Sequence, residues 1–406
     1  MKLFRSVIFW CHLLVGATAG LIIFIMSVTG VLLTYERQII AWADTRGYHV
    51  ARPSPAATRL SVETLLVKVR EKRPALPSTI TLRADPATPA AFGFTGGRTI
   101  FVNPYTGEVL GENARRIRPL FRKITDLHRS LGAQGERRDI ARAITGACNL
   151  GFLFLVTSGF YLWWPRKWTW KLIRNVTWFR RGLSGRARDF NWHNVIGFWL
   201  VAPLFIVVLS ATVISYPWAT NLVYRLVGET PPTPRTAPAQ TPVNVAPQPG
   251  AMENRDAQEA PPDGLDRLWV RAEQQVLGWQ SITLQMPTSL DAPVTFTIDQ
   301  GSGGQPHKRA QLMLDRTNGE IVRWEPFSSY TRGRQIRSFL RFAHTGEVGG
   351  IVGQTIAGLA SLGGAMLVWT GLALAWRRSR AWTARRSGAG RIRADSRLAE
   401  DATDPS

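Results

Sequence analysis

Four long runs of apolar residues alternate with polar, charged stretches along the chain. The runs are almost free of charged side chains, and each is at or above the ~20 residues that a helix needs to cross a bilayer core. They cover Val7–Thr34, Ala143–Trp164, Val195–Trp218 and Ile351–Trp376. The pattern predicts four membrane-spanning helices with two sizeable extramembrane segments, and it excludes a purely soluble protein.

Each of the two long extramembrane segments has a helical spacing of apolar residues followed by strand-like alternation. The predicted helices place their apolar residues at Val62, Leu65, Leu66 and Val69, and at Leu265, Leu268, Trp269, Ala272 and Val276. The predicted strands and glycine-turn hairpins are Ala91–Thr95 with Phe101–Val109, and Val294–Ile298 with Met313–Ile321. Each segment is therefore expected to form a small α+β module.

The two halves of the chain repeat each other. His12 is followed by Gly16 and Tyr35 at the same spacings at which His193 is followed by Gly197 and Tyr216. The second and fourth runs end on matching Ser-Gly and Thr-Gly pairs, Ser158-Gly159 and Thr370-Gly371. Both copies cross the membrane in the same direction, so the expected fold is an α-helical membrane protein. Its four transmembrane helices form two parallel repeats related by a pseudo-twofold axis along the membrane normal.

These patterns predict nine consecutive segments. They are a first span (1–35), a first exterior module with His128 at its membrane edge (36–140), a second span (141–165), a basic loop (166–192), a third span (193–218), a proline-rich linker (219–262), a second exterior module (263–345), a fourth span (346–377) and a basic tail (378–406).

The positive charge indicates membrane topology better than nucleic-acid binding. The chain has 50 Lys and Arg against 28 Asp and Glu, for a net charge of +22. Basic residues crowd the short loop between the second and third runs and the stretch after the fourth, as is typical of cytoplasmic loops. Both termini are therefore expected in the cytoplasm and both modules outside it.

Four of the six histidines stand at the starts of predicted spans. His12 and His193 occupy matching repeat positions at the cytoplasmic edge, and His128 and His344 lie at the exterior edge. Ionisable residues in or beside spans are costly and indicate function by default. The predicted symmetry would make each pair face each other.

Two opposed histidines suit a haem iron, which accepts one axial ligand on each face. Zinc requires four ligands, and no cysteine or carboxylate cluster accompanies either pair. A single histidine at a span end more often bonds headgroups or backbone, and span glycines either admit a flat macrocycle or pack helices together. These glycines are Gly16, Gly20, Gly146, Gly151, Gly197, Gly358, Gly363 and Gly364. His49 and His307 have no repeat partner and are expected on the surface.

The sequence Leu127-His128-Arg129, the element Ala343-His344-Thr345-Gly346-Glu347 and the glycine-rich spans resemble the PepSY-associated transmembrane proteins of bacterial inner membranes. The resemblance covers residues 1 to about 380 and implies exterior modules of PepSY type. Some members resemble siderophore-linked ferric reductases, which implies two haem b groups that pass electrons to a ferric siderophore in the periplasm. One departure is Ala211, which stands where the first half has Gly30.

The sequence shows no flavin or nicotinamide site. The glycine-rich run Gly301–Gly304 lies between strand patterns and does not open a helix, unlike a dinucleotide-binding loop. The electron donor is therefore expected to be a separate cytoplasmic reductase or a membrane quinol.

Arginines precede both exterior histidines, and Arg129 and Arg341 are our candidates for pairing with haem propionates. The other charges would either attract an anionic substrate or contact lipid headgroups. Two rival functions stay open at this point. One is a regulatory or interaction protein without haem, because PepSY-type modules resemble protease-inhibitory propeptides. The other is an electron-transfer subunit that serves a periplasmic partner enzyme.

Overall fold

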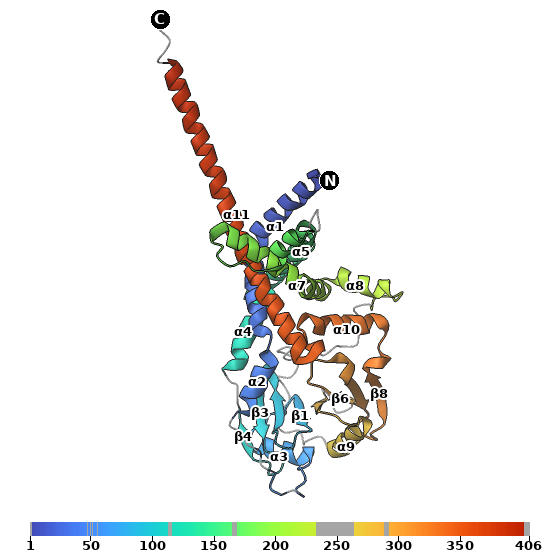
Figure 1. The fold of residues 1–406 in the computed structure, drawn as a ribbon. Coiled ribbons are helices and arrows are strands. Elements are labelled where there is room, and N and C mark those ends of the chain that lie inside the picture. The colour runs from blue at the N-terminus through green and yellow to red at the C-terminus, as the bar shows by residue number, and fades with distance from the viewer. Residues whose placement is uncertain are drawn as a thin grey trace. The chain divides into compact units, whose positions relative to one another are not determined.

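A computed structural model describes residues 2–401, except for 47, 49, 51, 55, 113–115, 165–168, 233–263 and 288–291 (Figure 1). The chain divides into two compact units, each of which is discontinuous in sequence. The membrane unit comprises Met1–Thr34, Ile124–Ser215 and Thr355–Ser406, and the sheet unit comprises Tyr35–Lys123 and Tyr216–Gln354.

The membrane unit is built on four long helices. They are α1 (Lys2–Leu33), α5 (Arg137–Trp163), α7 (Gly185–Ser215) and α11 (Gly350–Asp401). Among the described residues, these are the four helices long and apolar enough to cross a membrane. The four long apolar helices predicted from the sequence are thus confirmed. Three of them exceed their predicted segments: α5 begins at Arg137, α7 begins inside the predicted basic loop, and α11 continues through most of the predicted tail.

Glycines let the long helices approach one another. A Cβ atom built on Gly16 of α1 would lie 3.8 Å from Leu155 of α5, and one on Gly197 of α7 would lie 3.6 Å from Leu367 of α11. Glycines of the partner helices do the same. A Cβ atom built on Gly151 of α5 would lie 3.2 Å from Val15 of α1, and one on Gly363 of α11 would lie 3.3 Å from Ile196 of α7. Small residues at helix contacts are the usual way in which helices associate in membranes.

Five shorter helices are distributed over the two units. They are α2 (Glu36–Thr45), α4 (Ile117–Ser130), α6 (Trp170–Thr177), α8 (Pro217–Leu226) and α10 (Arg332–His344). The predicted linker 219–262 was wrong at its start, because its first residues belong to helix α8. The ring of Pro217 pre-sets the backbone angle of the first turn of this helix. Most of that linker lies outside the described residues. Helix α6 likewise occupies part of the predicted loop 166–192.

The sheet unit holds one eight-stranded antiparallel sheet in the order β4-β3-β2-β1-β5-β6-β7-β8 (Figure 1). The strands are β1 (Thr79–Arg83), β2 (Ala90–Phe94), β3 (Arg98–Val102), β4 (Val109–Gly111), β5 (Ser281–Gln285), β6 (Val294–Asp299), β7 (Arg309–Leu314) and β8 (Ile321–Pro326). Helices α3 (Val62–Lys72) and α9 (Leu265–Gln275) bury their predicted apolar faces against one side of this sheet. That contact forms the hydrophobic core of the unit.

Both predicted hairpins are present. In each, an Asn or Asp side chain closes the turn: Asn103 Oδ1 accepts a hydrogen bond from Tyr105 N at 2.9 Å, and Asp315 Oδ1 accepts one from Thr317 N at 2.8 Å. Gly107 and Gly319 follow with φ values of 73°. Glycine adopts such positive φ angles without steric cost, so the two turns have the same form for the same reason.

The two halves of the sheet join at strands that the sequence analysis did not predict. Strand β1 pairs with β5, so that Ile80 lies opposite Leu284 within the core. Nearby, Asp266 Oδ1 accepts a hydrogen bond from Glu63 N at 3.0 Å, and Glu63 Oε1 accepts one from Asp266 N at 3.2 Å. The first turns of α3 and α9 thus cap each other. The exterior segments, expected as two modules, share one sheet.

Candidate functional site

His12 lies on α1, close to the N-terminal end of the membrane unit's first span. Its Nδ1 atom is 2.8 Å from the Ser158 hydroxyl on α5. Ser158 is buried, and its hydroxyl also donates a 2.6 Å hydrogen bond to the backbone carbonyl of Phe154. The helix contact between α1 and α5 therefore holds this imidazole by one of its two ring nitrogens.

His193 repeats this arrangement between α7 and α11. Its Nδ1 atom is 3.0 Å from the buried Thr370 hydroxyl, which donates to the carbonyl of Met366 at 2.8 Å. The ring also forms a hydrogen bond with the backbone of Leu367. The structure thus anchors in the same way the two histidines that the sequence analysis paired.

His128 is held in the same way between α4 and α1. It lies on α4, and its Nδ1 atom is 2.8 Å from the hydroxyl of the buried Thr29 on α1. The Thr29 hydroxyl donates to the carbonyl of Ile25 at 2.7 Å. From His12 to Thr29, α1 rises about 25 Å at ~1.5 Å per residue. The two anchored histidines are therefore separated by most of a ~30 Å bilayer core.

The hydroxyl contacts determine the tautomer of each ring. A hydroxyl that gives its proton to a backbone carbonyl can only accept from the imidazole, so Nδ1 carries the hydrogen. The other ring nitrogen, Nε2, then keeps its lone pair, which is the form of histidine that binds a metal. Metal-binding histidines commonly donate their second N–H to such a partner. This assignment applies equally to His12, His193 and His128.

A glycine follows each of the three hydroxyl residues. A Cβ on Gly159 would lie 3.4 Å from Cε1 of His12, one on Gly371 would lie 3.4 Å from Cε1 of His193, and one on Gly30 would lie 3.7 Å from Cε1 of His128. The glycines thus leave room beside each ring. The glycines that the sequence analysis considered for a macrocycle, such as Gly16 and Gly363, contact side chains of neighbouring helices instead.

His344 and Arg341 belong to the other unit. Both lie on α10 of the sheet unit, where Arg341 is exposed and its guanidinium carbon is 5.9 Å from the Phe342 ring centre. His344 is half-buried at the last position of the helix. The structure describes His128 and His344 within separate units, so their pairing stays a prediction from the sequence.

Arg129 lies beside His128 at the end of α4 and has no hydrogen bond or ion pair from its side chain within the described part of the chain. Desolvation by the surrounding protein lowers the pKa of its guanidinium, and the charges of Arg142 and Arg138 lower it further. Asp126 opposes them, and it is already paired with Arg138 at 3.4 Å. Positive charge is thus in local excess, which suits an anionic ligand group.

Trp163 was missed by the sequence analysis. Its ring stacks on Phe198 at 4.5 Å, and its indole N–H is buried without a hydrogen-bond partner among the described residues. Buried N–H groups are nearly always paired, so this one calls for an acceptor oxygen. Trp163 follows Ser158 by about 7.5 Å along α5. It lies on α5, the helix that anchors His12.

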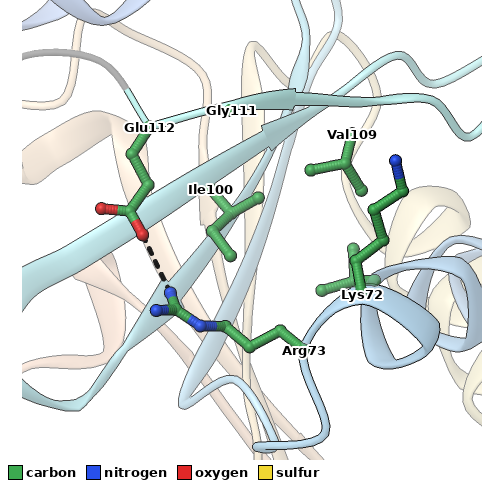
Figure 2. Close-up of a pocket in the computed structure, with 7 residues that line it drawn as sticks. Lys72, Arg73, Ile100, Val109, Gly111 and Glu112 are labelled. Atoms are coloured by element: carbon green, nitrogen blue, oxygen red, sulfur yellow. Dashed lines mark hydrogen bonds and ion pairs between the residues drawn. The ribbon is translucent and has the colours of Figure 1, made fainter.

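The sheet unit has a small pocket that is separate from these histidines. It has a volume of about 270 Å³ and lies between α3 and strands β3 and β4. Figure 2 shows its charged rim, where Arg73 and Glu112 form an ion pair at 2.9 Å. The described residues contain no cluster of three or more His, Cys, Asp or Glu side chains that could hold a metal ion. Within the described residues, we therefore take the histidines, and not this pocket, as the candidate cofactor site.

The hydroxyl partners could be found in the sequence only in part. Ser158-Gly159, Thr370-Gly371 and Thr29-Gly30 are the same Ser/Thr-Gly pair, which marks them as a group. Their assignment to particular histidines depends on which helix faces meet, and the spacing does not show that.

Comparison with known families places most of this chain in one of them. The model of the PepSY-associated TM region matches residues 9–378. The match includes all four histidines and both extramembrane segments. A comparison with curated proteins finds no match.

Proposed function

Because the chain belongs to the PepSY-associated transmembrane family, and because three of its histidines are anchored alike, we propose that it is an electron-transfer membrane protein. It binds two haem b groups between pairs of histidines and moves electrons across the bilayer. His12 and His193 form one pair, and His128 and His344 form the other.

The common hydrogen bonding of His12, His193 and His128 carries this proposal. A histidine that merely contacts lipid headgroups has no need of a buried hydroxyl that fixes its tautomer. In all three cases the hydroxyl is buried and already bonded to its own helix. Imidazoles that donate through Nδ1 to a fixed hydroxyl are in the tautomer whose Nε2 can ligate a metal, which fits the donor set that a haem iron requires.

Equivalent packing in the two halves supports the internal duplication. Gly16 meets Leu155 as Gly197 meets Leu367, and each of these pairs joins corresponding positions of the repeat. In the sheet unit, each half contributes four antiparallel strands and one covering helix. We infer from this a pseudo-twofold relation, with exterior modules of PepSY type that have merged into one sheet.

The residues around the histidines fit the remaining needs of a bound haem. Iron with an imidazole on each face supplies one-electron transfer without an open position for O₂. Trp163 offers a buried N–H to an acceptor oxygen, and Arg129 offers an uncompensated positive charge for a propionate. Arg341 is the corresponding candidate on α10.

The direction of transfer and the acceptor follow from charge and family resemblance. Basic residues cluster in the loop after α5 and at the end of α11, so we infer that this side faces the cytoplasm of a bacterial inner membrane. We propose a ferric siderophore as the periplasmic acceptor, which takes one electron to become ferrous. A cytoplasmic reductase or a membrane quinol would supply that electron.

Haem content and its loss in single variants test this proposal. Protein purified in mild detergent from haem-replete cells should show b-type absorption bands and close to two haems per chain. His12→Ala or His193→Ala should remove one haem, and His128→Ala or His344→Ala should remove the other, as distinguished by their reduction potentials.

His307→Ala is the matched control, because His307 is exposed on the sheet unit and has no role in either pair. It should keep both haems. A colourless preparation would overturn the proposal and favour the regulatory protein without haem. Loss of the same haem from His12→Ala and His128→Ala would refute the pairing while leaving haem binding intact.

A further inference from the structure

Helix α8 has an amphipathic pattern that is not explained by the sheet unit to which it belongs. It buries Ala219 and Tyr224, and Tyr224 lies on the side opposite its exposed apolar residues. Its outer face presents Trp218, Leu222 and Leu226, which are 54%, 47% and 76% exposed. Positions i, i+4 and i+8 lie along one side of a helix, so these three residues form one apolar stripe.

The chain connection restricts where this stripe can be. A single residue, Tyr216, separates the end of the spanning helix α7 at Ser215 from the start of α8 at Pro217. Because consecutive Cα atoms are about 3.8 Å apart, α8 must begin at the membrane boundary. Tyr216 and Trp218 contact each other at 5.8 Å, and such aromatic rings are enriched at the level of the headgroups.

The same arrangement recurs after the first span. Helix α2 begins at Glu36, shortly after α1 ends at Leu33. It buries Ala43 and exposes Ile39 and Trp42, at 38% and 55%. Two separate helices that each follow a span and each expose an apolar face argue for a common neighbour.

We propose that α8 is an in-plane membrane helix, whose Trp218, Leu222 and Leu226 stripe inserts into the phospholipid interface. Arg225 lies at the edge of the stripe and is exposed, so it can reach lipid phosphates while its stem stays in the apolar layer. The bilayer is the occupant that we assign, since α8 follows the spanning helix α7 after a single residue and exposes an apolar stripe.

The inner face of α8 transmits this anchoring to α10. The two helices lie side by side (Figure 1), and a Cβ on Gly333 would lie 2.3 Å from Cδ1 of Tyr224. Beyond α8, the Glu229 carboxylate accepts a 3.0 Å hydrogen bond from Gly333 N at the first turn of α10. Helix α8 therefore holds the helix that ends at His344 against the bilayer surface.

Spin-label accessibility in proteoliposomes tests the lipid contact. The chain has only two cysteines, so a background with Cys11→Ala and Cys148→Ala allows single labels at Leu222→Cys and Leu226→Cys. Leu277→Cys is the matched control, because Leu277 is 85% exposed in the same unit but lies in the turn between α9 and β5. The probes are O₂, which partitions into lipid, and a water-soluble Ni(II) chelate.

We expect the ratio of O₂ to Ni(II) accessibility to be at least about threefold higher at Leu222 and Leu226 than at Leu277. Equal ratios at the three positions would overturn the proposal. Protection from both probes would also overturn it, because a protein partner would then cover the stripe. The measurement needs no haem, so its result is independent of the electron-transfer proposal.

Discussion

At the scale of single residues, each anchored histidine contacts a hydroxyl group that makes two hydrogen bonds. Ser158 closes a hydrogen bond within its own helix and receives one from His12 on another helix. The first bond satisfies the hydroxyl proton, and the second sets the imidazole tautomer. Ser158 is thus a positioning residue that acts through His12.

Ser158→Ala should weaken haem binding at the His12 site by about 10- to 100-fold, the usual effect of losing such a partner of a metal ligand. Without the hydroxyl, His12 can rotate and can present either ring nitrogen. Titration of the apoprotein with haem measures the affinity, and redox titration should show a shifted potential for this haem alone. Ser158→Thr should restore both values.

Thr157→Ala is the neighbouring control. The Thr157 hydroxyl donates to the carbonyl of Leu153 at 3.0 Å but is exposed and contacts no histidine in the described structure. If Thr157→Ala and Ser158→Ala changed haem binding equally, the effect would arise from the helix rather than from the His12 contact.

At the scale of elements, β8 and α10 are joined by a charged cluster. Arg334 donates from two nitrogens to the two carboxylate oxygens of Glu325, each at 3.3 Å, and Arg323 pairs with the same carboxylate. The Glu325 side chain is only 13% exposed. Burial alone would raise the pKa of Glu325, but the two arginines outweigh it and hold that pKa below its usual value.

Glu325→Gln should lower the free energy of unfolding of the sheet unit by about 1–3 kcal/mol at pH 7, because charged hydrogen bonds of this kind contribute that much. A lowered pKa in the folded state means that the stabilisation is present above about pH 4.3 and is lost as the pH falls through the folded value. Urea unfolding in detergent should therefore show a difference between wild type and variant that shrinks toward pH 3.

Glu320→Gln provides the comparison, since Glu320 is an exposed turn residue of the preceding hairpin. It should unfold like the wild type at both pH values. A difference between Glu325→Gln and wild type that stayed constant down to pH 3 would contradict the ion-pair explanation.

The elements that could be predicted from sequence are those with a strong period or a marked turn. The four spans, α3, α9 and both hairpins are of this kind. Strands β1 and β5 are as long as the predicted β2, but no glycine turn marks them in the sequence, and they were missed. Helix α8 was missed because its apolar outer face continues the composition of the span before it. The partner of each histidine depends on tertiary packing, which the order of residues does not reveal.

At the scale of the whole molecule, the relay through two haems that we propose predicts electron transfer from one face of the bilayer to the other. Proteoliposomes with an internal reductant should reduce an external ferric siderophore, which cannot cross the bilayer itself. His12→Ala should abolish this reduction, because the remaining haem lies too far from the internal face, given the ~25 Å along α1 between the two anchoring positions.

Absorbance of a ferrous-specific external dye follows the reaction, and His307→Ala should match the wild type. Reduction at the native rate by His12→Ala protein that has lost one haem would refute the relay. Haem-loaded protein that fails to reduce any ferric siderophore would instead favour a periplasmic partner enzyme as acceptor.

The pairing of β1 with β5 has a consequence for biogenesis. Ile80 and its strand neighbours are made long before Leu284 and theirs, and the spanning helices α5 and α7 are synthesised between them. Until α7 has been inserted, the first half of the sheet has an unpaired edge at β1, and such edges readily pair with other chains. The nascent protein therefore depends on timely membrane insertion, or on a chaperone that shields this strand, to avoid aggregating before its second half arrives.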